Sequence, residues 1–351
     1  MPVTYEQLIV GANYQFKTVS AGDPIDNVNA NRPLMDWFIK NREPSYYTNG
    51  IYADKVRLTN DGNAQDYHGD DELEFNSRDS VRHAEYQHYE CFSGFTLNET
   101  EMTNNGIIIT SDSQEAKMTE AEGRILVNKV KEGWATTKED LIEHLDRRLH
   151  LDGVANPKAA PGLDALISTT PTLGTVAGLS AVVYDKWRNG ADMGITYSNS
   201  EDLIDRLDRL WRRCAMYSKQ GLPDFIPLGG DAYDAVKRAA RAVNVVNTNL
   251  GSGGATLDPG TAMLRYNGVP CVHDYTFDRL DELLGPITYP WAKRGYFLNS
   301  RSLKLRPVKG RWMMTREPEK LPNRMSHFFG MVCDYGLTTN QRNNQAVFSI
   351  A

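Results

Sequence analysis

The acidic segment that begins at Asp61 carries the oxygen-bearing side chains that a calcium ion requires. Four of them stand at the first, third, fifth and twelfth positions of a calcium-binding loop: Asp61, Asn63, Gln65 and Glu72. Asp66, however, occupies the sixth position, where the tight turn of such a loop requires glycine, and the flanking sequence has the pattern of strands. We therefore expect an exposed acidic loop here, with no bound metal ion and no other cofactor in the protein.

Three other motifs lack a residue that their chemistry needs. The Gly-rich segment 251–254 has neither the lysine nor the hydroxyl residue that completes a phosphate-binding loop, and Ser180 in GLSAV lacks one glycine of a nucleophile elbow. His144 and His150 are six residues apart, so on one helix they do not present metal ligands on a common face. The sequence predicts no catalytic residues and no enzyme; the alternative is an α+β enzyme whose site forms only in the fold.

Length and composition are those of an ordinary folded protein with a substantial core. The 351 residues suffice for two domains or one elaborated domain, and 40% are hydrophobic and 24% charged. No apolar run approaches the ~20 residues of a membrane helix, and the N-terminus lacks the pattern of a secretion signal. The four cysteines lie far apart without a C-x-x-C pair, which predicts free thiols. We expect folding in a cytoplasm and no membrane partner.

Charge is distributed unevenly along the chain, although the net charge is only −6. Residues 61–80 contain seven acidic residues and one basic residue, whereas residues 301–320 contain seven basic and two acidic residues. Opposite patches suggest contacts between copies of the chain; the alternative is two separately solvated surfaces. The net acidic balance argues against a dedicated nucleic-acid-binding protein. The predicted contact joins an acidic group to basic residues of a neighbouring copy, namely Asp70, Asp71 and Glu72 to Arg147 and Arg148 or to Arg301, Lys304 and Arg306.

Trp187 and Arg188 are a second candidate interface. Aromatic residues and arginine contribute much of the binding energy at protein interfaces, and these two follow one another directly before Asn189. Ordinary packing inside the domain is the alternative.

One long helix is expected to organise the chain. Between Met118 and His150, apolar residues recur four or seven positions apart and therefore share one helical face: Leu126, Val130, Trp134, Leu141, Leu145 and Leu149. The acidic and basic residues between them balance, which is typical of a solvated outer face. Gly133 and the capping pattern from Thr137 to Asp140 predict a kink or break near the middle.

Two segments before this helix have little core of their own. Residues 1–50 read as an arm with one short helical pattern, at Pro33 to Lys40. Strand patterns follow at Tyr52 to Leu58 and, as one long strand, at Val81 to Leu97. Two strands around a charged tip predict an extended hairpin, and because an isolated two-stranded ribbon is marginal in water, we expect it to reach onto a neighbouring subunit.

Helices and strands alternate irregularly in the rest of the chain. Helical patterns span residues 201–220 and 231–243, and a Gly- and Asn-rich loop spans 244–260. Strand patterns cover residues 223–228, 266–273 with an Asn267-Gly268 turn, 296–305 and 345–350. Because the regular βαβ repeat of a doubly wound sheet is missing, the sequence predicts an α+β fold.

Several segments occur together in an order that resembles a known family. These are GLDALISTTPT at 162–172 with Gly178 and Trp187-Arg188-Asn189, the LDRLWRRCAM helix leading into PDFIPLGGDAYDAV, and YFLNSRSLKLRP at 296–307. With the arm, the acidic hairpin and the long helix, they resemble the major capsid protein of tailed bacteriophages, the Hong Kong 97-like capsid fold. The resemblance covers most of residues 50–351.

The resemblance implies a domain organisation and a function. The expected parts are an N-terminal arm (1–50), an extended loop (51–105), a peripheral domain with the spine helix (106–194), an axial domain (195–290) and C-terminal peripheral strands (291–351). The chain would assemble as hexamers and pentamers into an icosahedral shell around double-stranded DNA, in the host cytoplasm and then in the virion. Implied partners are a portal protein, a decoration protein, weakly contacted DNA and, since the chain starts at Met1, a separate scaffolding protein. A compartment shell of the same fold that encloses an enzyme is the other alternative.

Overall fold

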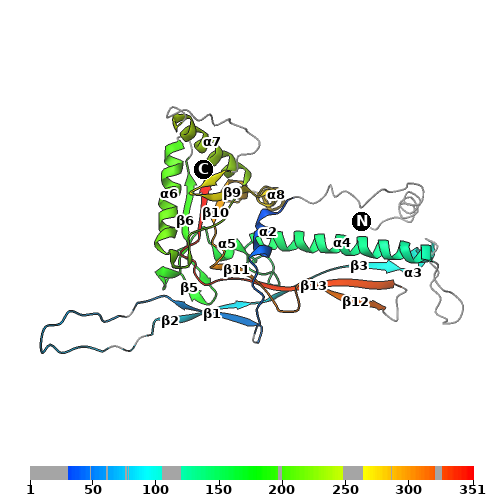
Figure 1. Cartoon of the computed structure of the whole chain (residues 1–351), viewed down its shortest axis with the longest axis horizontal. Coiled ribbons are helices and arrows are strands. Elements are labelled where there is room, and N and C mark those ends of the chain that lie inside the picture. The colour runs from blue at the N-terminus through cyan, green and yellow to red at the C-terminus, as the bar shows by residue number, and fades with distance from the viewer. Residues whose placement is uncertain are drawn as a thin grey trace. The chain divides into compact units, whose positions relative to one another are not determined.

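The computed structural model describes residues 31–47, 49–60, 62–75, 77, 79–104, 120–196, 200–247, 264–285, 287–320 and 326–351. These residues form two compact units (Figure 1). Unit 1 includes Phe92–Leu141 and Met314–Val332, and unit 2 comprises Asn31–Cys91, Ile142–Met313 and Cys333–Ala351. Helices and strands are mixed, which confirms the predicted α+β class. The predictions for residues 1–30, for Asp61 and for segment 251–254 lie outside the described residues.

A six-stranded mixed sheet is the main sheet of unit 2. Its strands, in spatial order, are β6 (Gly190–Ile195), β14 (Ala346–Ile350), β10 (Arg294–Phe297), β7 (Ile226–Leu228), β9 (Val269–His273) and β8 (Arg265–Tyr266). β14 runs parallel to β6 and antiparallel to β10, and β7 runs parallel to β9. Asn267 and Gly268 join β8 to β9 with positive φ at both residues, which is the type I′ geometry predicted from Asn-Gly.

Two amphipathic helices pack with this sheet (Figure 1). They are α6 (Ser200–Met216) and α7 (Gly230–Asn247), close to the predicted ranges. The apolar spacing of α6 predicts one face made of six residues, namely Leu203, Leu207, Leu210, Trp211, Cys214 and Met216. The first five are buried, but Met216, the last residue of the helix, is 69% exposed, so its assignment to that face is wrong.

Shorter elements complete unit 2, and α8 among them was not predicted. These elements are α5 (Leu163–Leu166), β4 (Thr175–Val176), β5 (Leu179–Ser180), η1 (Asp185–Trp187), η2 (Ser218–Gln220), α8 (Tyr275–Leu284) and η3 (Trp291–Lys293). The Asp274 side chain caps α8 by accepting a hydrogen bond from the Thr276 backbone N–H at 3.0 Å.

The segment before the hairpin belongs to the core of unit 2. Helix α2 (Pro33–Lys40) matches the predicted helical pattern, but Leu34, Met35 and Phe38 are completely buried. The following backbone is tied to β11 (Leu303–Pro307), since the Glu43 N–H donates to the Leu305 carbonyl at 2.9 Å. The expectation that this part contributes little to a core is therefore wrong for residues 31–47.

The predicted hairpin is present, but its second strand ends earlier than expected. β1 (Ile51–Arg57) pairs antiparallel with β2 (Val81–Gln87), from Ile51↔Gln87 to Arg57↔Val81. The single strand predicted for residues 81–97 is wrong, because a new strand, β3 (Tyr89–Asn98), begins after His88. β3 pairs with β13 (Ser326–Thr339), a strand that was not predicted, so the interruption separates two different pairings.

Unit 1 is built around the first part of α4 (Glu120–His150). It also contains α3 (Glu99–Asn104) and β12 (Met314–Lys320), which pairs antiparallel with the first part of β13. Phe95, Trp134 and Phe329 form its aromatic cluster, in which Phe95 stacks on Phe329 with ring centroids 4.8 Å apart.

Of the kink or break predicted near the middle of the long helix, the break is wrong, because α4 is continuous from Glu120 to His150. Gly133 serves packing instead: a Cβ at this position would lie 2.6 Å from Cε2 of Phe95. The small residue therefore allows a close approach between helix and ring rather than ending the helix. The predicted apolar stripe is confirmed at its second half, where Leu141, Leu145 and Leu149 are each at most 1% exposed.

Candidate assembly surfaces

The described part of the loop between β1 and β2 extends away from the rest of unit 2 (Figure 1). Asp70, Asp71 and Glu72 are all exposed. Asp71 Oδ2 accepts a hydrogen bond from the His68 backbone N–H at 2.8 Å, which orders the tip locally. We call residues 62–75 the hairpin tip.

The hairpin tip also exposes large apolar side chains between its charges. Tyr67 is 67% exposed, Leu73 47% and Phe75 91%. By contrast, Ala84 and Tyr86 at the base of the hairpin are buried, and the Tyr86 hydroxyl donates to the Thr339 carbonyl at 2.5 Å. The base is thus anchored in unit 2, while the tip combines exposed apolar and acidic groups, which is the composition of a surface that meets another protein.

Two of the side chains that were compared with a calcium-binding loop, Asn63 and Gln65, make hydrogen bonds within the tip. The side-chain amides of Asn63 and Gln65 both donate to the Glu74 carbonyl oxygen, the latter at 3.2 Å, and so close the loop with protein hydrogen bonds. Among the described residues, no three acidic groups of the tip lie close enough to share a metal ion.

The predicted basic partners differ in how accessible they are. Arg147 and Arg148 lie half-buried in the last turn of α4, and Arg301 is exposed in the turn before β11. Lys304 and Arg306 are instead paired inside the chain with the Glu43 carboxylate. The hydrogen bond from Lys304 lowers the pKa of Glu43, and the nearby charge of Arg306 adds to the effect.

Arg306 is a structural residue rather than a surface one. It is 6% exposed, and its guanidinium donates to Thr338 Oγ1 at 2.9 Å and to Ser45 Oγ at 3.0 Å. Its guanidinium carbon also lies 4.3 Å from the centre of the Tyr52 ring. These contacts leave Arg301 as the accessible member of the three basic residues predicted at 301–306.

Trp187 and Arg188 also contact their own chain. The indole of Trp187 is 1% exposed and donates to the Val176 carbonyl at 3.2 Å, so its side chain follows the packing alternative. Arg188 donates to the carbonyls of Ala181 and Val182, at 2.6 and 3.1 Å. It thereby holds a loop on which Val182 and Val183 are 60% and 70% exposed.

Arg342 is a residue of this region that the sequence did not single out. It is 1% exposed and donates to the carbonyls of Leu166 and Trp187 and to Asn189 Oδ1, at 2.7, 3.0 and 3.1 Å. Burial lowers its pKa to about 10. A buried arginine that satisfies three oxygen atoms fixes the segment around Trp187, although it lies over 150 residues further along the chain.

Comparison with known proteins identifies the fold. No protein-family model matches the sequence, and no curated protein matches it. Among solved structures, the capsid of cyanophage A-1(L) has a TM-score of 0.65 at 15% identity, covering 94% of this chain and 95% of that chain. The capsid of cyanophage P-SCSP1u has a TM-score of 0.54 at 10% identity, covering 97% of this chain and 94% of that chain. The chain has the phage capsid fold.

The same fold occurs in a shell that is not a phage head. The SrpI encapsulin complex from Synechococcus elongatus matches with a TM-score of 0.51 at 14% identity, covering 97% of this chain and 94% of that chain. The match covers nearly the whole of each chain, so the phage capsid fold is present as a complete unit rather than as a fragment.

Several ionisable groups are buried in unit 2, and His150 among them contacts two neighbouring residues. His150 is completely buried, with Nε2 at 3.1 Å from Asp274 Oδ2 and Nδ1 at 2.7 Å from the Asp146 carbonyl oxygen. Burial raises the pKa of the Cys214 and Cys271 thiols to about 12, which keeps them protonated.

No helix in the described part of the chain has the length and apolar character required to cross a membrane.

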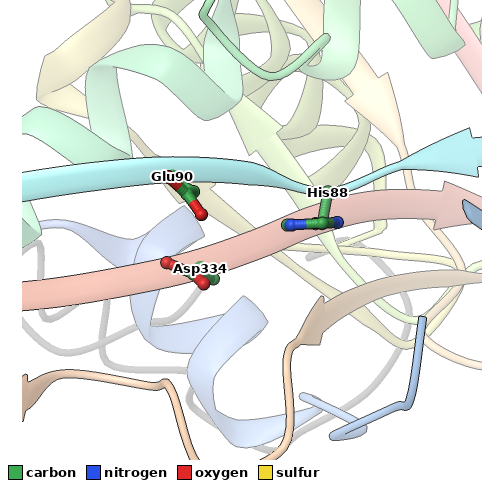
Figure 2. Close-up of side chains that lie close together, drawn as sticks. All are labelled: His88, Glu90 and Asp334. Atoms are coloured by element: carbon green, nitrogen blue, oxygen red, sulfur yellow. The ribbon is translucent and has the colours of Figure 1, made fainter. Parts of the chain in front are cut away.

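One group of three side chains in unit 2 has the composition of a metal site. His88, Glu90 and Asp334 each place a ligand atom within 4.8 Å of the other two (Figure 2). The sequence gives little signal for this group, because Asp334 lies more than 240 residues after the other two. In addition, the sequence predicts one strand through His88, so it does not indicate that the strand is interrupted there.

Proposed function

We propose that the chain is the major capsid protein of a tailed phage, with the Hong Kong 97-like form of the capsid fold. In this proposal it self-assembles as hexamers and pentamers into an icosahedral shell around double-stranded DNA and is located in the virion. The observation that carries the proposal is the full-length likeness to the A-1(L) capsid, at a TM-score of 0.65. The apolar side chains of the hairpin tip support it, since Tyr67 and Phe75 are 67% and 91% exposed and an exposed apolar surface is typical of a contact with another protein.

The domain assignment follows the same proposal. Residues 1–50 would include the arm, 51–105 the extended loop, 106–194 and 291–351 the peripheral domain, and 195–290 the axial domain. In the assembled shell, Asp70, Asp71 and Glu72 of one copy contact Arg147 and Arg148, or Arg301, of the next. Charges brought together at an interface steer the encounter and fix its register more than they add affinity.

Further partners belong to this proposal. A separate scaffolding protein would guide assembly, a portal protein would occupy one vertex, and a decoration protein would be a further partner. Packaged DNA would meet only weak contacts that do not depend on its sequence, because the chain carries a net charge of −6.

A compartment shell that encloses protein cargo is the second candidate, because the encapsulin likeness also covers nearly the whole chain. The contents of the shell distinguish the two candidates. A phage head holds double-stranded DNA inside a nuclease-resistant particle, whereas a compartment holds a protein.

Electron microscopy of the recombinant chain, expressed with and without the gene immediately upstream, tests the proposal. Shells, or rings of five and six subunits, are expected in at least one sample. Particles purified from the natural source should then release DNA, and no stoichiometric second protein, when they are disrupted after nuclease treatment. Small dimers or tetramers in both recombinant samples would contradict a shell function, and a cargo enzyme without DNA would establish the compartment.

A further inference from the structure

The side chains of His88, Glu90 and Asp334 converge between two neighbouring strands of unit 2. Figure 2 shows the carboxylates of Glu90 and Asp334 facing each other, with an edge of the His88 ring beside them. His88 directly precedes β3 and Glu90 is the second residue of that strand, and Figure 2 shows both side chains near Asp334. Asp334 comes from β13. The geometry therefore combines one imidazole and two carboxylates.

The hydrogen bonding of His88 orients the ring as a metal ligand. Nδ1 lies 3.2 Å from the Gly50 carbonyl oxygen, which can only accept, so Nδ1 carries the proton of the neutral ring. Nε2 then has a free lone pair. The Tyr47 ring packs against the imidazole, with centroids 5.2 Å apart, and restricts its rotation. In metal-binding histidines, the ring nitrogen that does not bind the metal commonly donates to a carbonyl or carboxylate oxygen, and this hydrogen bond fixes the tautomer.

Asp334 contributes a buried oxygen that has no hydrogen-bond donor in the described part of the chain. Its side chain is 2% exposed, and Oδ2 lies 2.5 Å from Nε of Arg311. Oδ1 is buried and has no hydrogen-bond partner among the described residues. An unsatisfied buried carboxylate oxygen is costly, and a cation at this position would supply the missing interaction.

Arg311 balances only part of the negative charge. Its guanidinium pairs with Asp334 and reaches Glu90 Oε1 at 3.8 Å, so one cation faces two carboxylates. Glu90 is 65% exposed, so its side chain is able to move toward an incoming ion. In a tetrahedral site with bonds of about 2.1 Å, ligand atoms lie about 3.4 Å apart, so the three ligand atoms, now within 4.8 Å of one another, would draw closer together around an ion.

We propose that His88 Nε2, Glu90 and Asp334 Oδ1 bind a zinc ion, with a fourth position open to solvent beside Glu90. An imidazole with two carboxylates suits Zn²⁺ better than Ca²⁺ or Mg²⁺, which prefer oxygen ligands alone. The ion joins the start of β3 to β13 at the point where the chain leaves the hairpin. This site differs from the sequence-based expectation of no metal, and it does not depend on the proposed shell function.

Titration of the metal-free, unassembled full-length chain with Zn²⁺ alone tests this site. We expect one saturable Zn²⁺ per chain by calorimetry and by native mass spectrometry, with binding at least about tenfold weaker in His88→Gln and in Glu90→Gln. His83→Gln is the matched control, because His83 is an exposed histidine on the adjacent β2 and should leave binding unchanged. Ca²⁺ and Mg²⁺ should bind at least about tenfold more weakly than Zn²⁺.

Thermal unfolding provides a second readout that uses the His88→Gln and His83→Gln variants, so that the buried Asp334 is left unchanged. Zn²⁺ should raise the unfolding midpoint of the wild-type chain and of His83→Gln, but not that of His88→Gln, because a ligand of the native state stabilises it by mass action. Failure to find a saturable site, or Zn²⁺ binding unaffected by both His88→Gln and Glu90→Gln, would overturn the proposal and leave the group as an ion pair with Arg311.

Discussion

His150 is charged within the core, between two carboxylates that it affects differently. Burial alone would lower the pKa of His150, but Asp274 and Asp146 outweigh it and raise the pKa to about 9. Burial raises the pKa of Asp146, whereas for Asp274 the charge of His150 and its hydrogen bond outweigh burial and lower the pKa. Asp274 is therefore the carboxylate whose charged form His150 favours, and it also caps α8.

This shift predicts that stability decreases in mild alkali. A histidine whose pKa is higher in the folded state stabilises the fold fully below its unfolded value of ~6.5, and that contribution is lost as pH rises through about 9. We expect the wild-type chain to lose about 3 kcal/mol over this interval and His150→Gln to lose much less. Urea unfolding of the unassembled chain at pH 6, 7.5 and 9 measures both. Equal slopes for the two proteins would contradict a charged His150.

The acidic residues of the hairpin tip have a predicted role between copies. Reversing Asp70, Asp71 and Glu72 to Lys should reduce shell yield at least about tenfold, because like charges would face Arg147 and Arg148 of a neighbour. The monomer should keep its circular dichroism spectrum, since all three side chains are exposed. Adding Arg147→Glu and Arg148→Glu should restore part of the yield, whereas those two changes alone should reduce it. Normal shells from the tip variant would refute the contact.

Charge and residue type predicted the exposed acidic tip well but overestimated the basic surface. Nothing near Arg306 in the sequence shows that Thr338 and Ser45 surround its guanidinium. Trp187 is similar, because the arginine that lies over its ring is Arg342. Local sequence carries the type of a side chain, but its burial depends on residues far along the chain.

Gly133 offers a test of how helix and strand fit together in unit 1. In an exposed helix, Gly→Ala would stabilise by about 1 kcal/mol through helix propensity. Because a Cβ here would lie 2.6 Å from the Phe95 ring, we expect Gly133→Ala to destabilise the chain by about 1–3 kcal/mol instead. Chemical unfolding measures the sign directly, with Thr136→Ala, an exposed change on the same helix, as control. Stabilisation by Gly133→Ala would show that the ring moves away freely.

The elements with a strong local pattern were predictable, and those defined by pairing were not. The faces of α4 and α6 follow directly from their apolar spacing, and Asn267-Gly268 specifies its turn. The division between β2 and β3 at His88 has no such signal, because both sides favour strands; only the change of partner from β1 to β13 separates them. The same reason explains the false break at Gly133, where the decisive neighbour, Phe95, lies outside the helix.

For the molecule as a whole, the anchored base and the exposed tip of the hairpin predict that folding and assembly are separable. At the base of the hairpin, the side chains of Val56, Ala84 and Tyr86 are buried, whereas Phe75 in the tip is 91% exposed. Replacing residues 62–75 by Asn-Gly should therefore leave the unfolding midpoint of the monomer within about 2 °C, because little buried area is lost.

Shells should nevertheless fail to form, since the tip is the part of the hairpin that exposes large apolar side chains for a contact with a neighbouring copy. Analytical ultracentrifugation and electron microscopy of the shortened chain measure assembly, and the unfolding midpoint measures the fold. Phe75→Ser, which removes only the most exposed apolar side chain, should give an intermediate yield, because the charges of the tip stay in place. Complete shells from the shortened chain would place the contacts that close the shell on other surfaces. A monomer that no longer folds would show that the tip stabilises unit 2 itself.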